Sequence, residues 1–517
     1  MKMELKTVLL LIGVSLIVTA ACALAHTDVT AEQAHELIGS TGDLTVIDVR
    51  EPSEYCGTRG HIPGALNYPW NSGVLQAQYE ELPVDSAILV VCQSGGRSNQ
   101  AATFLDSEGF SMVYDMLGGM SAWIWETEPC VEVEEKYSGG KGEPNDPYQI
   151  ATAEDLMLLG ETPEDYDKHF ILTADINLDP NLPGRKVFDK AVIAPDTNDV
   201  EPGFQGVPFT GVFDGNGCTI SYLSCMSKGK SYVALFGYVS GYSAEIKHLG
   251  LIDPNVSAEQ NAFSIGSLTG EILFGTLTNC YVEGCNISGE NFVGGFVGGN
   301  NHGTIRNCYA IGTVSGFEHL GGLAGGNSGW IMNSYTDVSV TGNNTIGGLV
   351  GYNASGRESV GTIQQCYSVG ILMGDGEVGG LVGGQSGIVI DSFWDIETSG
   401  QTESASGEGK TTAEMQTAST FLEAGWDFVG ETDNGTENIW SICEGTNYPR
   451  FVWQIPAGDF ICPDGVTIED FAFFMEHWLD DNCDSSNGYC DGTDLDQSGT
   501  VGVLDLEIFF ENWPAED

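Results

Sequence analysis

Basic residues are scarce in this chain: 18 lysines and arginines stand against 73 aspartates and glutamates, a formal net charge of −55 at pH 7. So acidic a balance repels phosphate backbones and anionic membrane surfaces, and it therefore argues against nucleic-acid binding. It suits calcium binding or solubility outside the cell. Hydrophobic residues still make up 41% of the chain, which is enough for packed cores, so the acidity does not indicate global disorder.

Long apolar runs are missing after residue 25, so no later segment is predicted to span a bilayer. Residues 1–25 differ, because Lys2 and Lys6 flank the start of an apolar run that ends in small residues ahead of His26. This pattern predicts a signal peptide at 1–25, with an uncleaved anchor as the alternative. We therefore expect a mature protein that is secreted, periplasmic or held at the cell surface.

Zinc-type spacing is also missing, because none of the 14 cysteines belongs to a C-x-x-C or H-x-x-C pair. Cysteines of an exported protein are more often paired as disulfides. Cys462, Cys483 and Cys490 cluster near the C-terminus and are the best candidates. Their odd number leaves the pairing open, with Cys443 as a fourth candidate.

Two quantities are large. The length of 517 residues exceeds what a single core supports, which predicts several domains. The chain contains 70 glycines, which indicates repeated tight turns.

Residues 27–129 are predicted to form an α/β unit. Apolar runs at 44–49 and 88–91 predict buried strands, and the flanking segments have helical composition. Alternating strands and helices favour a parallel sheet, whose active sites lie at the carboxyl ends of the strands. Cys92 lies at such an end.

The run 92–98 (CQSGGRS) combines features that favour an anion and a thiolate. Gly95 and Gly96 allow successive backbone N–H groups to point inward, and the run leads into the N-terminus of a predicted helix. Arg97 adds a fixed positive charge. Cys92 is thus predicted to be a nucleophile near neutral pH, and the alternative is a small buried hydrophobic residue.

Four motifs in this unit resemble those of single-domain rhodaneses, which are sulfurtransferases. They are Asp48-Val49-Arg50 with Glu54-Tyr55, Gly60 to Ala65 with Asn67, Cys92 to Ser98, and Leu117 to Met120 with Trp123. The resemblance implies that a cysteine takes a sulfane sulfur from a small donor anion such as thiosulfate. It holds the sulfur as a persulfide and passes it to a thiophilic acceptor, without a cofactor.

Carried over to this chain, the resemblance makes Cys92 and Arg97 the catalytic residues. The substrate-binding loop then consists of Gln93, Ser94, Gly95, Gly96 and Ser98. Backbone amides of such a loop can stabilise both a thiolate and a persulfide anion in place of water.

Three residues near the loop leave alternatives open. Asp48 and Arg50 are supporting residues, either as an ion pair that braces the loop or as catalytic groups. His61 either makes structural hydrogen bonds or acts as an acid or base. Cys56 either pairs with Cys130 or resolves an oxidised catalytic cysteine.

A linker rich in turn-forming residues is predicted at 130–147. Residues 148–455 beyond it contain internal repeats. A glycine-rich motif starts at 265, 293, 320, 346 and 378, and each copy is followed by a second motif that ends in an aromatic residue. Short repeats of this period predict the coils of a solenoid, in which stacking buries the apolar faces.

This block resembles the GLUG-repeat family, which implies an all-β, right-handed parallel β-helix of about six coils. The family's usual supposed role is adhesion or surface display. One coil position holds only small residues, which predicts an inward ladder: Cys280, Cys308, Ser334, Cys366 and Ser392. The next position predicts an aromatic ladder, either for packing or partly as a sugar-binding strip: Tyr281, Tyr309, Tyr335, Tyr367 and Phe393.

Residues 458–517 repeat a loop and helix at an offset of 35, so that Asp470 to Trp478 aligns with Asp505 to Trp513. The second loop matches the oxygen ligands of a calcium loop at Asp494, Asp496, Ser498, Thr500 (through its carbonyl) and Asp505. The first loop is a weaker candidate, with Asp459, Asp464 and Asp470, because Ile461 and Pro463 replace ligands.

The duplicated loop and helix resemble a dockerin, a small α-helical calcium module. This resemblance implies calcium in the tail and a cohesin-like or cell-surface partner. The pairs Ile468-Glu469 and Val503-Leu504 lack the Ser-Thr pattern of well-known cohesin binders, which weakens the prediction of a cohesin.

Two classes of function follow for this exported, three-part chain. In the first, the head is a working sulfurtransferase that the β-helix and the calcium tail attach to a surface or complex. In the second, the whole is a non-catalytic extracellular adhesion or assembly protein, whose head is a sensor or binding module.

Overall fold

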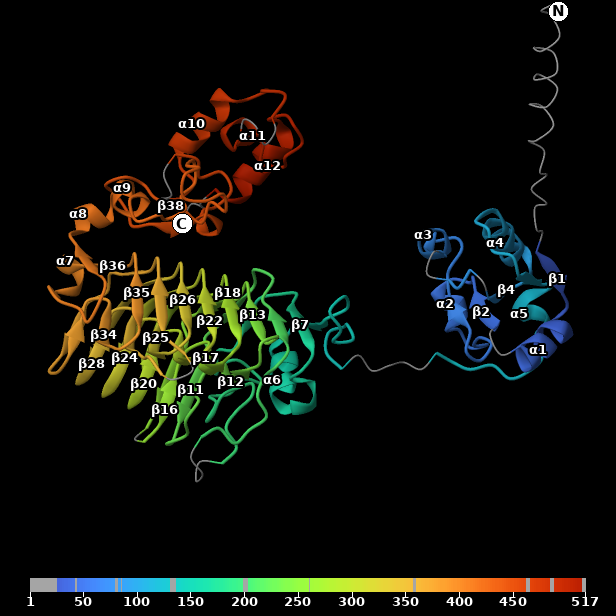
Figure 1. The fold of residues 1–517 in the computed structure, drawn as a ribbon. Helices are drawn as coiled ribbons and strands as arrows, with labels where there is room; N and C mark the ends of the chain where they lie inside the picture. The colour runs from blue at the N-terminus through green and yellow to red at the C-terminus, as the bar shows by residue number, and fades with distance from the viewer. Residues whose placement is uncertain are drawn as a thin grey trace, which may run out of the picture. The chain divides into compact units, whose positions relative to one another are not determined.

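The computed structural model describes residues 26–513, apart from 42–43, 80–81, 85, 131–135, 199–202, 260, 357–358, 462–464 and 484–487. The chain forms two compact units, one up to residue 134 and one from residue 135, so the division lies within the predicted linker 130–147 (Figure 1). The predicted signal peptide at 1–25 lies outside the described residues. Among the described residues, no helix has the length and apolar character needed to cross a membrane.

The first unit is an α/β domain on a five-stranded parallel sheet, as predicted. Its strand order is β1-β5-β4-β2-β3, with β1 (Thr27–Val29), β2 (Leu44–Asp48), β3 (Leu66–Asn67), β4 (Ala87–Val91) and β5 (Val113–Met116). Its helices are α1 (Ala31–Ser40), α2 (Pro52–Tyr55), α3 (Val74–Gln78), α4 (Gly96–Ser107) and α5 (Gly119–Ala122).

The central strand β4 explains why this sheet is parallel and covered. All five of its residues are buried. Ile88 and Val90 belong to one apolar layer with the α4 residue Leu105, and Leu89 and Val91 belong to a second layer with α1. Because both faces are covered, the strand is continuously apolar.

A disulfide joins Cys56 and Cys130 and so ties the segment after α2 to the end of this domain. Of the two alternatives for Cys56, the structure therefore has the disulfide. Such cross-links are typical of proteins in oxidising compartments.

The second unit is dominated by a parallel β-solenoid, as the repeats predict (Figure 1). The helix α6 (Ala153–Glu161) lies at its start, capped by Thr152. One sheet consists of β6 (Tyr148–Ile150), β7 (His169–Leu172), β9 (Val212–Asp214), β13 (Glu245–Lys247), β18 (Thr276–Thr278), β22 (Thr304–Arg306), β26 (Trp330–Met332), β30 (Thr362–Gln364) and β35 (Ile388–Ile390).

The longest sheet of the solenoid has twelve strands. They are β8 (Ile176–Asn177), β10 (Thr219–Ser221), β11 (Ser224–Ser227), β14 (Gly250–Ile252), β15 (Asn255–Ala258), β19 (Tyr281–Ser288), β23 (Tyr309–Ser315), β27 (Tyr335–Gly342), β31 (Tyr367–Ser368), β32 (Leu372–Gly374), β36 (Phe393–Asp395) and β37 (Glu408–Lys410).

Two shorter parallel sheets complete the coils. The first holds β12 (Phe236–Ser240), β17 (Thr269–Leu273), β21 (Val297–Asn301), β25 (Ala324–Asn327), β29 (Val350–Asn353) and β34 (Val382–Gln385). The second holds β16 (Phe263–Ile265), β20 (Asn291–Gly294), β24 (Glu318–Gly321), β28 (Asn344–Gly347) and β33 (Val378–Gly379).

The glycine-rich motif of each coil forms the tight corner between these two shorter sheets. Val293 pairs in register with Leu320, which pairs with Ile346 in the next coil. A Cβ atom on Gly294 would lie 2.1 Å from the carbonyl oxygen of Val297, a distance that no side chain tolerates. The repeat therefore needs glycine where the backbone turns back on itself.

The small-residue position forms the predicted inward ladder, and each member is buried. The hydroxyl of Ser334 donates to the carbonyl of Met332 at 2.8 Å and accepts the backbone N–H of Cys308 at 3.2 Å. The thiols of the equivalent cysteines likewise donate to the carbonyl two residues earlier. These side chains therefore satisfy buried backbone groups at a corner.

The aromatic ladder stacks ring on ring and is covered by the segment that follows the last coil. Tyr309 and Tyr335 have ring centroids 4.9 Å apart and interplanar angles of 4°. The covering segment 412–454 includes α8 (Thr412–Met415), α9 (Ala418–Leu422), β38 (Trp440–Ser441) and β39 (Arg450–Phe451). Because the ring faces contact one another, the ladder serves packing. Tyr281, Tyr309 and Tyr335 also line a cavity of about 980 Å³, and the sugar-binding alternative stays a prediction.

The tail is a small helical module with α10 (Ile468–Glu476), α11 (Gly488–Asp491) and α12 (Val503–Glu511). Phe474 and Phe509 from the two longer helices are fully buried against each other, with ring centroids 5.4 Å apart. A disulfide joins Cys483 and Cys490, and Cys443 is also disulfide-bonded, whereas Cys462 lies outside the described residues. The assignment of this module as a dockerin stays a prediction.

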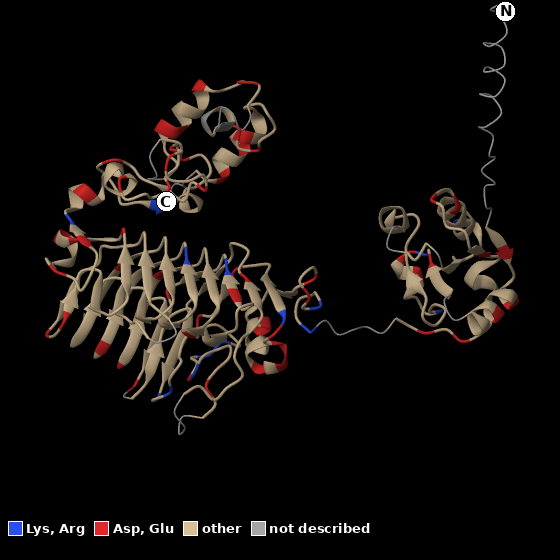
Figure 2. Ribbon diagram, viewed as in Figure 1, with Lys and Arg blue, Asp and Glu red and all other residues tan. Residues whose placement is uncertain are grey.

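Acidic residues are spread over the head, the solenoid and the tail, and few lysines and arginines lie among them (Figure 2). The short α7 (Ile396–Ser399) closes the last coil, where Asp395 caps its N-terminus through the N–H groups of Glu397 and Thr398.

Candidate active site at Cys92

Cys92 lies where β4 ends and α4 is about to begin. The backbone N–H of Gly95 donates to Cys92 Sγ at 3.1 Å, and the thiol donates to Ser98 Oγ at 3.4 Å. If the thiol loses its proton, the Ser98 hydroxyl can turn and donate to the sulfur instead. The sulfur therefore has one aimed donor, and a second once the thiol is deprotonated, at the N-terminus of a 12-residue helix, a place that favours negative charge.

Glycines on both sides give the Cys92 loop its shape. Gly95 has φ of 97°, a left-handed conformation in which its N–H can face the sulfur. Gly119 presses on the loop from the other side, and a Cβ atom there would lie 2.2 Å from the carbonyl oxygen of Cys92. The N–H of Met120 donates to that same carbonyl at 2.7 Å, so the LGGM motif holds the loop in place.

Arg97 does not stand free in the loop, because Glu54 holds it with two hydrogen bonds. Its Nη1 and Nη2 donate to the two carboxylate oxygens of Glu54 at 2.5 and 2.7 Å. This bidentate contact holds the pKa of Glu54 below its ordinary value. Glu54 raises the pKa of Arg97 further, and the nearby Cys92 adds to that rise. A positive charge thus lies near the sulfur but is partly neutralised.

Glu54 is the functional neighbour that sequence reasoning missed. It stands 43 residues before Arg97 and belongs to α2, so no local spacing connects the two. The one sign of its importance in the sequence is that it belongs to the motif that runs from Asp48 to Tyr55.

Asp48 and Arg50 form a buried ion pair, each 1% exposed, at 2.7 Å. Arg50 also donates to the carbonyls of Glu54 and Gly60 at 3.0 and 2.9 Å. All these contacts are internal and fix the segment that carries Glu54. The geometry therefore suits bracing of the loop.

His61 stacks on the ring of Tyr55, with centroids 3.8 Å apart, and its Nε2 lies 3.4 Å from a carboxylate oxygen of Glu128. Its backbone exchanges hydrogen bonds with the backbone of Glu128. These contacts suit the structural alternative for His61.

In the tail, the structure brings together Asp494, Asp496 and Asp505, whose carboxylate oxygens lie within 4.8 Å of one another. The N–H of Gly499 donates to Asp494 at 2.9 Å, and Gly499 has the left-handed φ of 95° that the sharp turn of a calcium loop needs. Ser498 Oγ lies 3.3 Å from the carbonyl oxygen of Thr500. The donor set of the second loop, all oxygen atoms, therefore fits calcium.

The first loop of the tail is arranged differently. Asp470, in the first turn of α10, accepts from the backbone N–H groups of Phe460, Ile461 and the N-cap residue Thr467. Asp459 accepts the N–H of Gly465 at 2.9 Å. Asp464 lies outside the described residues. Within the described part of the tail, acidic ligands converge only in the second loop.

Comparison with known proteins finds matches for the first domain and for the repeats. The model of the rhodanese-like domain matches residues 30–125, and the model of the GLUG motif matches residues 291–315. A sulfurtransferase from Allochromatium vinosum is 31% identical over 107 residues, which are 21% of this chain and 96% of that protein. A putative sulfur carrier protein, YrkF, from Bacillus subtilis is 33% identical over 101 residues, which are 20% of this chain and 52% of that protein.

A solved structure of a rhodanese-related protein from Thermoplasma volcanium is 32% identical and covers 19% of this chain and 89% of its own, with a TM-score of 0.17. Almost the whole length of the Allochromatium vinosum sulfurtransferase is thus matched by this chain. The head is a sulfurtransferase-like domain, and through residues 30–125 the chain belongs to the family of rhodanese-like proteins.

Proposed function

We propose that this protein is an exported sulfurtransferase that moves a sulfane sulfur through a persulfide on Cys92. The Cys92 thiolate attacks the outer sulfur of a donor such as thiosulfate, the S–S bond of the donor breaks, and sulfite leaves with the electron pair. The product is a Cys92 persulfide anion. A thiophilic acceptor such as cyanide then attacks the terminal sulfur, leaves as thiocyanate and restores the thiolate.

One observation carries this proposal: the Gly95 N–H points at Cys92 Sγ from 3.1 Å at the start of α4. A donor aimed at the sulfur stabilises charge there without reorganisation during the reaction. The helix N-terminus adds to the same effect. Arg97 supplies the positive charge that an anionic donor meets as it approaches.

The loop also suits small reactants. Cys92 is only 1% exposed, whereas Ser94 and Gly96 beside it are exposed. Access to the sulfur thus depends on a few exposed loop residues, which favours small anions over bulky reactants. This selection by size fits the donors named above.

The remaining parts are proposed to attach the head outside the cytoplasm. The disulfides support an oxidising compartment, whether secreted, periplasmic or at the cell surface. The solenoid supplies a long, regular scaffold, and the second tail loop is proposed to hold calcium through Asp494, Asp496, Ser498, Thr500 and Asp505. A cohesin-like or cell-surface partner for the tail is proposed on the resemblance to a dockerin.

The test is a thiosulfate-to-cyanide transfer assay on the full chain, with Cys92→Ser beside the parent. Cys218→Ser is the matched control, because Cys218 is the free cysteine of the described residues that is not fully buried. We expect Cys92→Ser to lose thiocyanate formation and Cys218→Ser to keep it. Transfer that survives in Cys92→Ser would exclude Cys92 from the mechanism.

A further inference from the structure

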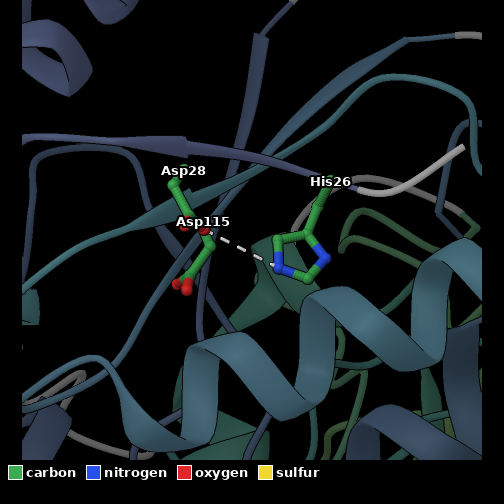
Figure 3. A group of neighbouring side chains, drawn as sticks. All are labelled: His26, Asp28 and Asp115. Atoms are coloured by element: carbon green, nitrogen blue, oxygen red, sulfur yellow. Dashed lines mark ion pairs between the residues drawn. The ribbon is translucent and has the colours of Figure 1, made fainter.

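A second cluster of chemically active side chains lies in the head, where β1 meets β5. These two strands are parallel neighbours, and Asp28 is the register partner of Asp115. Directly paired residues on neighbouring strands project from the same face of the sheet. Two carboxylates are therefore held side by side, together with His26, which comes directly before β1 (Figure 3).

The imidazole of His26 is oriented toward the two carboxylates. Its Nδ1 lies 2.8 Å from a carboxylate oxygen of Asp106, and its backbone N–H donates to the same oxygen. This contact fixes the tautomer that leaves the lone pair on Nε2, which accepts from Asn99 Nδ2 at 3.1 Å and lies 3.8 Å from Asp28 (Figure 3). A bound ion would take the place of the Asn99 contact. A carboxylate behind one ring nitrogen is the usual support of a metal-binding histidine.

Asp115 gives independent evidence that a ligand belongs here. Its side chain is 0% exposed, and neither of its carboxylate oxygens accepts a hydrogen bond. Burial raises the pKa of Asp115, and the Ser98 and Asn99 side chains are close enough to oppose this rise in part. A buried carboxylate without a partner is costly unless a cation neutralises it.

We propose that His26, Asp28 and Asp115 bind a divalent cation of the zinc type. One atom from each side chain lies within 4.8 Å of the others, so an ion between them closes the site with small side-chain movements. One imidazole nitrogen and two carboxylate oxygens are a ligand set that zinc accepts, with water in the fourth position. The two negative charges balance the charge of the ion.

The imidazole nitrogen distinguishes the ligand set of this site from that of the calcium loop in the tail, which offers oxygen atoms alone. A bound ion would tie the three-residue strand β1 to β5, its neighbour in the sheet. No spacing motif in the sequence announces such a site, because its ligands come from two strands that lie far apart in the chain.

The test is calorimetric titration of the full chain with zinc chloride in excess calcium, which fills the tail. The background is Cys92→Ser, because a free thiolate can itself bind zinc. We expect Asp115→Asn and His26→Gln each to lose one bound zinc per chain. His248→Gln is the matched control, since His248 also contacts an aspartate, Asp214 at 3.1 Å, and should keep the full stoichiometry.

A second readout separates loss of the ion from loss of the fold. Zinc should raise the thermal midpoint of the parent and of His248→Gln, and leave the midpoints of Asp115→Asn and His26→Gln unchanged. Circular dichroism without zinc should show the same fold for all four proteins. Equal zinc stoichiometry in the parent and in a folded Asp115→Asn protein would overturn the proposal.

Discussion

Glu54 sets how much positive charge a donor meets at the Cys92 loop. It holds the Arg97 guanidinium by both carboxylate oxygens, and the contact keeps Arg97 in one orientation. The same contact offsets the charge that would attract an anion. Glu54 therefore holds Arg97 in position but weakens the attraction of Arg97 for an anionic donor.

Glu54→Gln should shift that balance toward attraction. The glutamine still accepts one hydrogen bond from Arg97, while one negative charge near the sulfur is lost. Removing about 1 kcal/mol of repulsion should lower the KM for thiosulfate about fivefold. Steady-state transfer assays measure this effect, and Glu32→Gln, an exposed residue of α1, serves as the control. A rise in KM would show instead that Arg97 needs the full ion pair to be held.

At this scale the sequence predicted the nucleophile and the loop better than their neighbours. Cys92, Gly95 and Arg97 follow one another, so their chemistry can be read from a short run. The partner of Arg97, and the residues proposed to bind a cation together with Asp115, lie on other elements of the chain. Their proximity depends on how the strands order in the sheet, which no local pattern encodes.

The coils of the solenoid are held by ladders of repeated contacts. The buried amide of Asn300 donates to Asn327 at 2.8 Å, and Asn327 donates in turn to Asn353 at 2.9 Å. The cysteine and serine ladder performs a similar task at another corner. Each member satisfies backbone groups that water cannot reach.

Ser334→Ala tests whether the ladder stabilises through these hydrogen bonds. The change leaves the Cys308 N–H without its partner and removes one of the two donors to the Met332 carbonyl, which still accepts from the Asn307 N–H, so it should cost about 1–3 kcal/mol of stability. Urea denaturation followed by tyrosine and tryptophan fluorescence measures the loss. Ser334→Cys, which copies the neighbouring coils, should cost less, and an alanine variant as stable as the parent would contradict the account.

At the scale of secondary-structure elements, the repeated segments could be predicted from the sequence. The segments that occur only once could not. The register from Val293 to Ile346 follows from one motif used in every coil. The segment 412–454 occurs once, yet it covers the aromatic ladder: the Tyr367 hydroxyl donates to the carbonyl of Pro449 at 2.5 Å. This contact spans 82 residues, so no periodicity reports it.

At the scale of the whole molecule, the net charge of −55 makes the acidic side chains repel one another, and bound cations reduce this repulsion. Calcium in the tail would offset two of the three negative charges of carboxylates that lie within 4.8 Å of one another. Because calcium would bind the folded loop and not the unfolded chain, binding should also stabilise the tail.

Asp496→Ala should abolish calcium binding at the second loop. Asp496 is exposed and its main contacts are inside the loop, so the substitution removes a ligand without disturbing the core. Calorimetric titration of the full chain with calcium chloride measures the loss. Asp480→Ala, which removes an exposed carboxylate outside the loop, should bind as the parent does, and unchanged binding by Asp496→Ala would remove calcium from this loop.

The central claim, that one sulfur atom of the head carries the transferred sulfur, is tested most directly by mass spectrometry of the intact chain after incubation with thiosulfate. The account predicts a gain of one sulfur atom, located on Cys92 by peptide mapping and removed by cyanide. A chain that gains no sulfur under these conditions, or gains it equally when Cys92 is serine, would contradict the account.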